Sequence, residues 1–276
     1  MTDIKSMGLY RNVDRILADL ASDGFGADDP LSVDDLSKYD QYHYEGTDAV
    51  DDAIHAIGVG SESVVLDVGS GLGGPARYIA DHTGARVTAL ELQADLDATA
   101  ALLTERCGLS AQVEHRNGNV LNGDAPTNTF TGLVSMLCFL HIPDRAKLFT
   151  NCAASLRSGG VMFIDDYVEL APLQPAERDA LASTVYCTYL PDTTTYVRDV
   201  TAAGFTDVEV VDKTAQWTEF VNDRLVLFRA NRSALIERYD APTVDGLDHF
   251  YSTVVDLFGG GRLGGLRLIA RLPDAD

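Results

Sequence analysis

The sequence has few basic residues for its size. It carries 21 lysines and arginines against 42 aspartates and glutamates, which gives a formal net charge of −21 over 276 residues. A negative field of that size repels nucleic-acid phosphates and anionic membrane surfaces, so neither is an expected partner. The acidic runs 23–35 and 48–52 are most simply solvated surface, although a salty cytoplasm would produce the same charge balance.

Cysteines and long apolar runs are also scarce. Cys107, Cys138, Cys152 and Cys187 form no Cys-x-x-Cys pair, so reduced thiols are expected rather than a zinc site or a disulfide framework, and no metal is predicted. No apolar run reaches membrane-spanning length, and residues 1–20 lack the uninterrupted apolar core of a signal peptide. The sequence therefore predicts a cytoplasmic protein.

Glycine, in contrast, is concentrated in one stretch. The apolar run 64–68 leads through four glycines in the six positions 69–74 into a segment that is typical of a helix. Glycine adopts positive φ at little cost and lets a ligand approach main-chain N–H groups at a helix N-terminus. The stretch predicts a nucleotide-type cofactor site; a glycine turn that merely joins a strand to a helix is the alternative.

Two acidic residues indicate which cofactor fits. Glu91 ends the next apolar run, where a carboxylate accepts hydrogen bonds from a ribose diol, which both NAD and S-adenosylmethionine carry. Asp67 lies two residues before the glycine turn, where it would repel a pyrophosphate but attract the cationic part of S-adenosylmethionine. S-adenosylmethionine is therefore the predicted cofactor, with S-adenosylhomocysteine as its product. The predicted cofactor-binding residues are Asp67, Gly69, Ser70, Gly71, Glu91, Leu92, Asn119, Val120 and Leu137.

Strand-like and helix-like segments alternate after the glycine turn. Strands are expected over 63–68, 86–91, 111–116, 130–137, 161–165, 204–211 and 266–272, and helices over 73–82, 95–107, 144–156, 217–239 and 247–258. This order predicts an α/β fold with a Rossmann-like, doubly wound seven-stranded sheet that is mostly parallel, with an antiparallel last strand. Ligands of such sheets bind at the carboxyl ends of the strands.

Two further segments flank this pattern. Residues 1–58 are expected to form N-terminal helices and a lid, with a helix over 49–57 capped by Thr47 or Asp48, and residues 59–276 form the main domain. Three tyrosines lie between 39 and 44, where they would cover the site or pack against the first helix. The tyrosine-rich segment at about 167–200 is the expected cap over the methyl acceptor or an equivalent substrate.

With these residues in hand, the chain resembles the class I S-adenosylmethionine-dependent methyltransferases through 66–71, Glu91 and Asn119. More loosely, nearly the whole chain is similar to the small-molecule branch that contains phosphoethanolamine and sarcosine/dimethylglycine methyltransferases. The segments that carry this similarity are 135–141, 163–167, 195–198 and the late helices.

The resemblance implies roles on the acceptor side. In the phosphobase enzymes a histidine and a lid tyrosine form a pair over the acceptor. His141 stands in that place as the candidate base, and Tyr42 or Tyr44 is the candidate phenol. The implied substrate contacts are Tyr39, Tyr167, Tyr189, Tyr196 and Arg198. Leu137 replaces an acid found in relatives, and bases are sparse in the cap, which disfavours a phosphorylated acceptor.

The predicted function is N-methylation of a small amine or amino-acid-like acceptor by a monomer or homodimer. S- or O-methylation of a comparable metabolite is the nearest alternative, because the same scaffold serves any nucleophile. A nicotinamide-dependent oxidoreductase and a non-catalytic nucleotide-binding protein are the alternatives from other classes.

Overall fold

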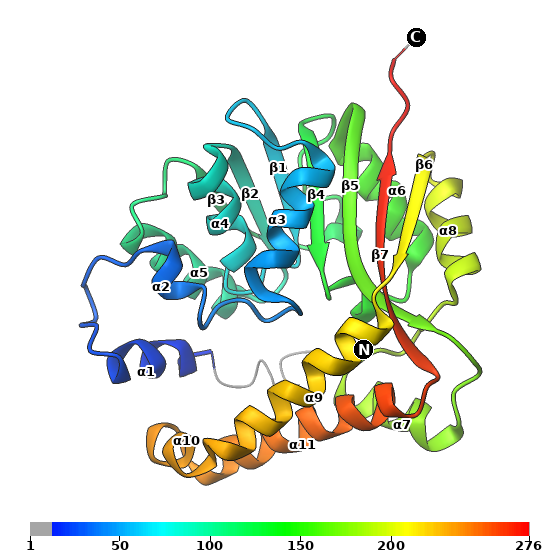
Figure 1. The fold of residues 1–276 in the computed structure, drawn as a ribbon. Coiled ribbons are helices and arrows are strands. Elements are labelled where there is room, and N and C mark those ends of the chain that lie inside the picture. Colours follow the sequence, from blue (N-terminus) through cyan, green and yellow to red (C-terminus); the bar gives the residue numbers. More distant parts are fainter. Residues whose placement is uncertain (1–12, 276) are drawn as a thin grey trace.

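A seven-stranded sheet forms the centre of the computed structural model, which describes residues 13–275 (Figure 1). Its strands are β1 (Val64–Val68), β2 (Arg86–Glu91), β3 (Val113–Asn117), β4 (Phe130–Met136), β5 (Leu156–Glu169), β6 (Thr206–Asp212) and β7 (Leu263–Arg271). The strand order is β3-β2-β1-β4-β5-β7-β6, with β7 antiparallel to both of its neighbours and β1 to β5 paired in parallel. The predicted sheet is therefore confirmed.

Helices cover both faces of this sheet, as its central strands require. Strand β2 is buried along nearly its whole length, which is typical of parallel strands with helices on both sides. On one face, α3 (Gly46–Ile57) and α4 (Gly74–Thr83) share a core cluster with β1, β2 and β4. On the other, α6 (Arg145–Ser155) and α8 (Thr193–Ala202) pack around Phe130 and Phe149. Helix α5 (Ala94–Arg106) contacts β2 and β3.

The remaining late helices lie across the end of the sheet where the parallel strands terminate (Figure 1). They are α7 (Pro175–Thr184), α9 (Thr214–Ala230), α10 (Arg232–Arg238) and α11 (Ala241–Gly259). Residues of β5, α7, α9 and α11 form a second core cluster around Trp217. The cap is therefore composed differently from the expected segment 167–200, because α8 packs against α6 and β6 and most of the cap follows β6.

The N-terminal part contributes α1 (Arg15–Ser22), α2 (Val33–Leu36) and α3, and the helix expected within 1–20 lies partly outside the described residues. Neither Thr47 nor Asp48 caps α3, because the helix already begins at Gly46. Glu45 precedes it in the left-handed conformation, with φ of 63°, and its carboxylate accepts hydrogen bonds from Lys213 and Trp217. A long-range contact thus replaces the local cap.

Two other boundaries differ from the expected ones. The single helix expected over 217–239 is two helices, since α9 ends at Ala230 and α10 begins at Arg232. Strand β5 begins at Leu156 and runs through Gly159 and Gly160 instead of starting after them. Neither change alters the strand order.

Candidate active site

The turn between β1 and α4 depends on glycine at Gly69. Gly69, Gly71 and Gly73 all have positive φ, and a Cβ atom added to Gly69 would lie 2.1 Å from the Sγ atom of Cys138. The turn therefore packs directly against Cys138, which follows β4 and Leu137. This close approach brings the ends of β1 and β4 together.

Glu91, the last residue of β2, fixes the middle of the glycine turn. Its carboxylate accepts hydrogen bonds from the backbone N–H of Gly71 at 2.9 Å and of Gln93 at 2.8 Å. Burial raises the pKa of Glu91, and these two donors oppose that effect. The structure thus brings Gly71 and Glu91, two predicted cofactor-binding residues, into direct contact.

Asp67 lies at the end of β1 and is only 2% exposed. Its Oδ2 atom and the Oγ atom of Ser70 are buried and have no hydrogen-bond partner among residues 13–275. Burial first, and then the neighbouring Glu91 carboxylate, raise the pKa of Asp67 to about 7. A buried carboxylate with an unused oxygen is costly unless a cation or a donor joins it, so this position fits a cationic ligand.

The other predicted cofactor residues lie at the same edge of the sheet. Leu92 follows β2 and is 54% exposed, whereas Val120 is buried in the core beneath the edge. Asn119 caps the short 3₁₀ helix Val120–Asn122, and its side-chain oxygen accepts a hydrogen bond from Leu121. Leu137 has a φ of 55° directly after β4, and its backbone N–H donates to the carbonyl oxygen of Asp165 within β5.

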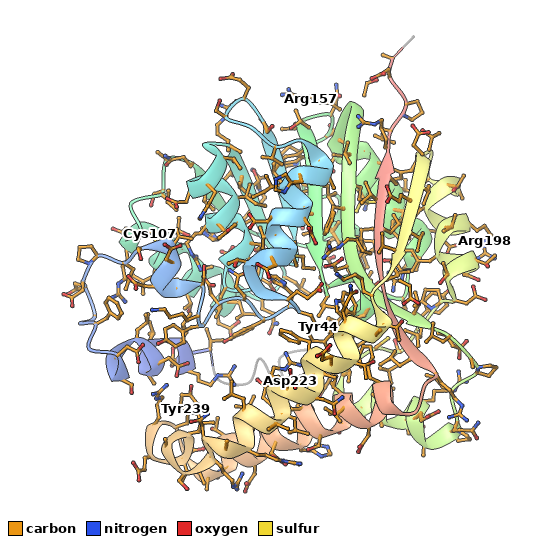
Figure 2. All side chains as sticks on the ribbon, viewed as in Figure 1. Tyr44, Cys107, Arg157, Arg198, Asp223 and Tyr239 are labelled. Carbon is orange, nitrogen blue, oxygen red and sulfur yellow. The ribbon has the colours of Figure 1, made fainter. Side chains whose placement is uncertain are left out.

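Tyr44, which Figure 2 labels beside α9, belongs to a cluster of aromatic rings. The ring centroid of Tyr44 lies 5.2 Å from that of Trp217 and 5.4 Å from that of Phe220. The hydroxyls of Tyr44 and Tyr167 form a short hydrogen bond, and both side chains are buried. This aromatic cluster, which we define as Tyr44, Tyr167, Trp217, Phe220 and Phe258, joins the lid segment to the end of β5.

The other two lid tyrosines have different partners. The Tyr42 hydroxyl accepts a hydrogen bond from Arg15 at 3.3 Å. Tyr39 packs on a separate core cluster near Leu36, and its hydroxyl donates to Asp23. The structure therefore does not bring Tyr39 to the aromatic cluster, because the chain turns between α2 and α3.

His141 ends a short 3₁₀ helix, Phe139–His141, which follows β4. Its Nδ1 atom lies 3.4 Å from the carbonyl oxygen of Tyr186. A carbonyl only accepts, so this contact favours the tautomer with the proton on Nδ1 and leaves Nε2 as the acceptor nitrogen. Burial lowers the pKa of His141 to about 4. The imidazole is thus neutral near pH 7.

Three predicted substrate contacts are not brought into the aromatic cluster. Tyr196 is buried in the main core, where its hydroxyl donates to Asp166 at 2.8 Å. Arg198 is exposed on α8 and forms an ion pair with Asp199. Tyr189 is half-buried, and its carbonyl accepts a hydrogen bond from Cys187. Tyr196 is buried because it lies on the face of α8 that packs toward the sheet.

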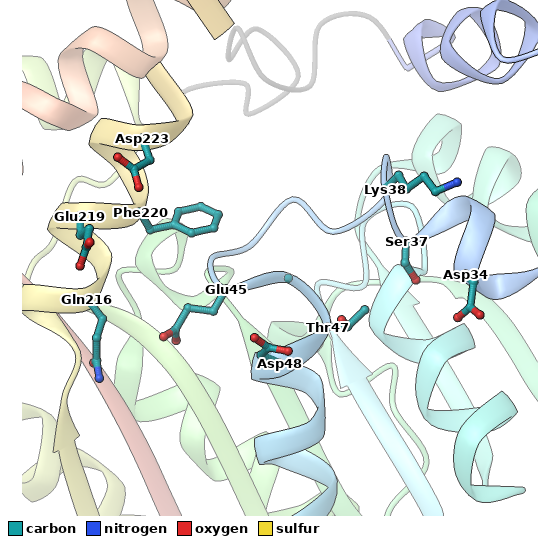
Figure 3. Close-up of a pocket in the computed structure, with 11 residues that line it drawn as sticks. Asp34, Ser37, Lys38, Glu45, Thr47, Asp48, Gln216, Glu219, Phe220 and Asp223 are labelled. Carbon is teal, nitrogen blue, oxygen red and sulfur yellow. The ribbon is translucent and has the colours of Figure 1, made fainter. Parts of the chain in front are cut away.

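An open groove of about 690 Å³ separates the N-terminal segment from α9 (Figure 3). Its carboxylates are Asp34, Glu45, Asp48, Glu219 and Asp223, and Lys38 is its one basic residue. Phe220 lines the groove and also belongs to the aromatic cluster. Sequence reasoning missed the contribution of α9; the four-residue spacing of Glu219 and Asp223 is the signal that places them on one helix face.

The sequence also led us to expect reduced cysteines and no metal site. All four cysteines are free thiols, and Cys138 is the one packed against the glycine turn. Among the residues the structure describes, there is no group of three or more histidine, cysteine or acidic residues that would hold a metal ion. None of the described helices is long and apolar enough to cross a membrane.

Residues 66–164 match the family model described as a methyltransferase domain. These residues run from β1 into β5 and include the glycine turn, Glu91 and His141. The stretch from β1 into β5 therefore matches a methyltransferase domain, which agrees with the expected enzyme class and favours it over the nicotinamide-dependent alternative.

Similar proteins with curated names include phosphoethanolamine N-methyltransferase 1 of Triticum aestivum, 29% identical over 188 residues, which are 68% of this chain and 37% of that protein. A sterol 24-C-methyltransferase of Eremothecium gossypii is 33% identical over 114 residues, 41% of this chain and 31% of that protein. The chain thus spans about a third of the length of these relatives.

Similar solved structures share the fold. Phosphoethanolamine N-methyltransferase 2 of Haemonchus contortus, in complex with phosphomonomethylethanolamine and S-adenosylhomocysteine, has a TM-score of 0.76 and 22% identity, covering 83% of this chain and 53% of that one. A putative sarcosine dimethylglycine methyltransferase from Galdieria sulphuraria has a TM-score of 0.74 and 18% identity. The match covers 82% of this chain and 85% of that chain. The expected Rossmann-like methyltransferase fold is confirmed.

Proposed function

We propose that this chain uses S-adenosylmethionine to methylate a nitrogen atom of a small polar acceptor. The observation that carries the proposal is the buried Asp67 carboxylate, which has an unused oxygen beside a glycine turn held by Glu91. The ligands named for the Haemonchus contortus structures, S-adenosylmethionine and S-adenosylhomocysteine, agree with this cofactor.

The residues of the glycine turn fit the cofactor's chemistry. When bound, S-adenosylmethionine supplies a methyl group on a sulfonium that leaves readily. Asp67 would bind its cationic portion, and Glu91 would accept from the ribose hydroxyls in exchange for one of its backbone donors. Asn119 and Leu92 would border the adenine at the ends of β3 and β2.

The acceptor side would position the attacking nitrogen and take up its proton. Orientation of two reactants alone corresponds to effective molarities on the order of 10⁵ to 10⁸ M. His141 is neutral, and its acceptor nitrogen would receive the proton of an ammonium acceptor, directly or through water. Tyr44, with Tyr42 at its side, would close over the acceptor and contribute about 0.5–2 kcal/mol of cation–π attraction.

Two observations favour an amine over a neutral acceptor. The open groove is lined by five carboxylates; Glu45 is paired with Lys213, and the field of the other four, Asp34, Asp48, Glu219 and Asp223, attracts cations. The Triticum aestivum relative that matches over 68% of this chain is named as an N-methyltransferase. A sterol C-methyltransferase is also similar over the shared domain, so the acceptor atom is decided by the groove and the aromatic cluster rather than by the domain match.

The test is a transfer assay with labelled S-adenosylmethionine and a panel of amines, amino acids, phosphobases, thiols and hydroxyl compounds. We expect the label on the nitrogen of a small amine or amino acid, identified by mass spectrometry. Label on sulfur or oxygen alone would replace N-methylation by the S- or O-methyl alternative. Tight binding of S-adenosylhomocysteine with no transfer to any acceptor would favour a non-catalytic binding protein.

A further inference from the structure

Arg224 is a half-buried cation with two buried N–H donors that have no hydrogen-bond partner among residues 13–275. It lies on α9, and the two donors are its Nε and Nη2 atoms. The neighbouring arginines behave differently, since Arg229 pairs with Asp248 and Arg232 pairs with Asp245. Buried guanidinium donors without partners are costly, so a ligand that supplies acceptors is expected at this position.

The two unused atoms define the shape of that ligand. Nε and Nη2 lie on the same edge of the planar guanidinium, with their N–H bonds nearly parallel. This fork matches the two oxygens of a carboxylate, or two oxygens of a phosphate, in a bidentate pair. A single carbonyl or hydroxyl would satisfy only one of the two donors.

Aromatic rings hold the guanidinium in place. Its central carbon lies 4.7 Å from the ring centroid of Tyr251, 5.1 Å from that of Tyr44 and 5.5 Å from that of Phe220. These rings exclude water without offering an anion, which strengthens any charged pair that forms there. The surroundings therefore position the cation and leave its binding edge for a ligand.

The position of Arg224 connects it to the proposed acceptor site. Tyr44, under the guanidinium, is hydrogen-bonded to Tyr167 near the end of β5. Phe220, which also contacts the guanidinium, lines the open groove. A small molecule that enters through the groove and displaces the Phe220 ring would reach the fork of Arg224.

We propose that Arg224 binds a carboxylate of the methyl acceptor in a bidentate pair, which makes the acceptor a zwitterionic amino acid. The proposal rests on the proposed function of the chain. A carboxylate is favoured over a phosphate because five acidic side chains and a single lysine line the groove. The acidic groove repels a phosphate dianion about twice as strongly as it repels a carboxylate. An amino acid, as a whole molecule, carries no net charge.

The test compares acceptors that differ only in the anionic group. N-methylglycine, N-methylethanolamine and phospho-N-methylethanolamine are assayed with labelled S-adenosylmethionine and with wild-type, Arg224→Gln, Arg224→Lys and Arg229→Gln proteins. We expect wild type to prefer N-methylglycine. Arg224→Gln should raise the KM for N-methylglycine about 10–100-fold and change kcat and the KM for N-methylethanolamine little. Arg224→Lys should fall between, and Arg229→Gln should match wild type.

A binding measurement separates this proposal from the proposed function. N-methylglycine, acetate and inorganic phosphate are titrated into the same proteins saturated with S-adenosylhomocysteine. Weaker binding of the carboxylates to Arg224→Gln supports the anion site even if no methyl transfer occurs. Equal binding by wild type and Arg224→Gln, a wild type that binds none of the three, or a preference for phosphate would overturn the proposal.

Folding of the variants is checked with S-adenosylhomocysteine affinity and thermal unfolding. Arg224→Gln removes the cation–π contacts with Tyr251, Tyr44 and Phe220, so its melting temperature should fall by a few degrees while its S-adenosylhomocysteine affinity stays near that of wild type. A large loss of melting temperature together with an unchanged KM for N-methylglycine would assign Arg224 a structural role instead. Arg224→Met, which keeps the apolar stem, replaces Arg224→Gln if the latter does not fold.

Discussion

The proposed donor side and the proposed acceptor side of the site are built in opposite ways. The donor side comprises the glycine turn 69–74, Asp67 and Glu91, which are close together in sequence and joined by backbone hydrogen bonds. The acceptor side draws Tyr44, His141, Tyr167 and Arg224 from four distant segments, and side-chain contacts hold most of it. The strand order of the sheet fixes the donor side, whereas the packing of α9 and α11 across the sheet fixes the acceptor side.

This contrast explains why the donor side and the acceptor side differ in how well they tolerate substitutions. The backbone geometry of the turn leaves little choice at Gly69, because any side chain there would clash with Cys138. Rings such as Phe220 are replaceable by other apolar residues without loss of fold. The same domain is therefore compatible with different acceptors, and substitutions on the two sides should separate cofactor affinity from turnover.

The largest effect is expected on the acceptor side, at His141. Replacement by Ala removes the proposed proton acceptor and should lower kcat about 100-fold or more, while S-adenosylhomocysteine affinity stays near that of wild type. Because burial holds its pKa at about 4, His141 stays neutral above about pH 5, so it should add no step to the pH profile between pH 6 and 8. Calorimetry and steady-state kinetics check both statements; unchanged turnover would make His141 structural.

On the donor side, Asp67→Asn should weaken S-adenosylmethionine binding about 30–100-fold, because the buried carboxylate loses its charge opposite a cation. The matched control is Asp81→Asn, an exposed aspartate on α4. Calorimetric titration of both variants measures the difference. Equal affinities for the two variants would remove Asp67 from the cofactor site.

Glu91→Ala should combine a loss of affinity with a loss of stability. The side chain accepts two backbone hydrogen bonds, so its removal should cost about 2–3 kcal/mol of unfolding free energy and about tenfold in affinity. Denaturant unfolding and calorimetry report the two quantities. An effect on affinity with no effect on stability would mean that the turn holds its shape without Glu91.

Because the pKa of Asp67 is raised, we expect the stability of the ligand-free protein to depend on pH. The folded state binds the Asp67 proton between the unfolded value of 3.8 and about 7, so this group's contribution to stability falls as pH rises through about 7. Asp67→Asn should therefore stabilise the ligand-free protein by about 1–3 kcal/mol near pH 8 and have little effect near pH 4. Melting temperatures across this range measure it, and a constant difference at all pH values would contradict it.

The smallest effect is expected for Tyr44→Phe. The variant keeps the ring that packs against Trp217 and Phe220 and loses the hydroxyl that hydrogen-bonds to Tyr167 and interacts with Arg224, which should cost about 1 kcal/mol. We expect a KM for the acceptor raised about threefold to tenfold, with cofactor affinity unchanged. Tyr39→Phe is the control, since the Tyr39 hydroxyl meets Asp23 at a distance from the aromatic cluster.

The sequence predicted the sheet and the turn between β1 and α4 well because both depend on local patterns. The apolar runs of β1 and β2 and the glycines between β1 and α4 encode their own geometry. The N-cap of α3 was missed because Lys213, far along the chain, holds Glu45. Tyr196 and Arg198 lie away from the aromatic cluster that contains Tyr167 because α8 packs on the main sheet, so their role as substrate contacts stays a prediction. Arg224 was missed because its partners are rings from other segments.

The most direct test is a crystal structure of the protein with S-adenosylhomocysteine. We expect the ribose hydroxyls to contact the Glu91 carboxylate and the amino group of the ligand to lie within hydrogen-bond distance of the donor side, with Asp67 facing its cationic portion. A nucleotide bound elsewhere, or an Asp67 carboxylate that still has an unused buried oxygen and no ligand nearby, would contradict the assignment of the donor side.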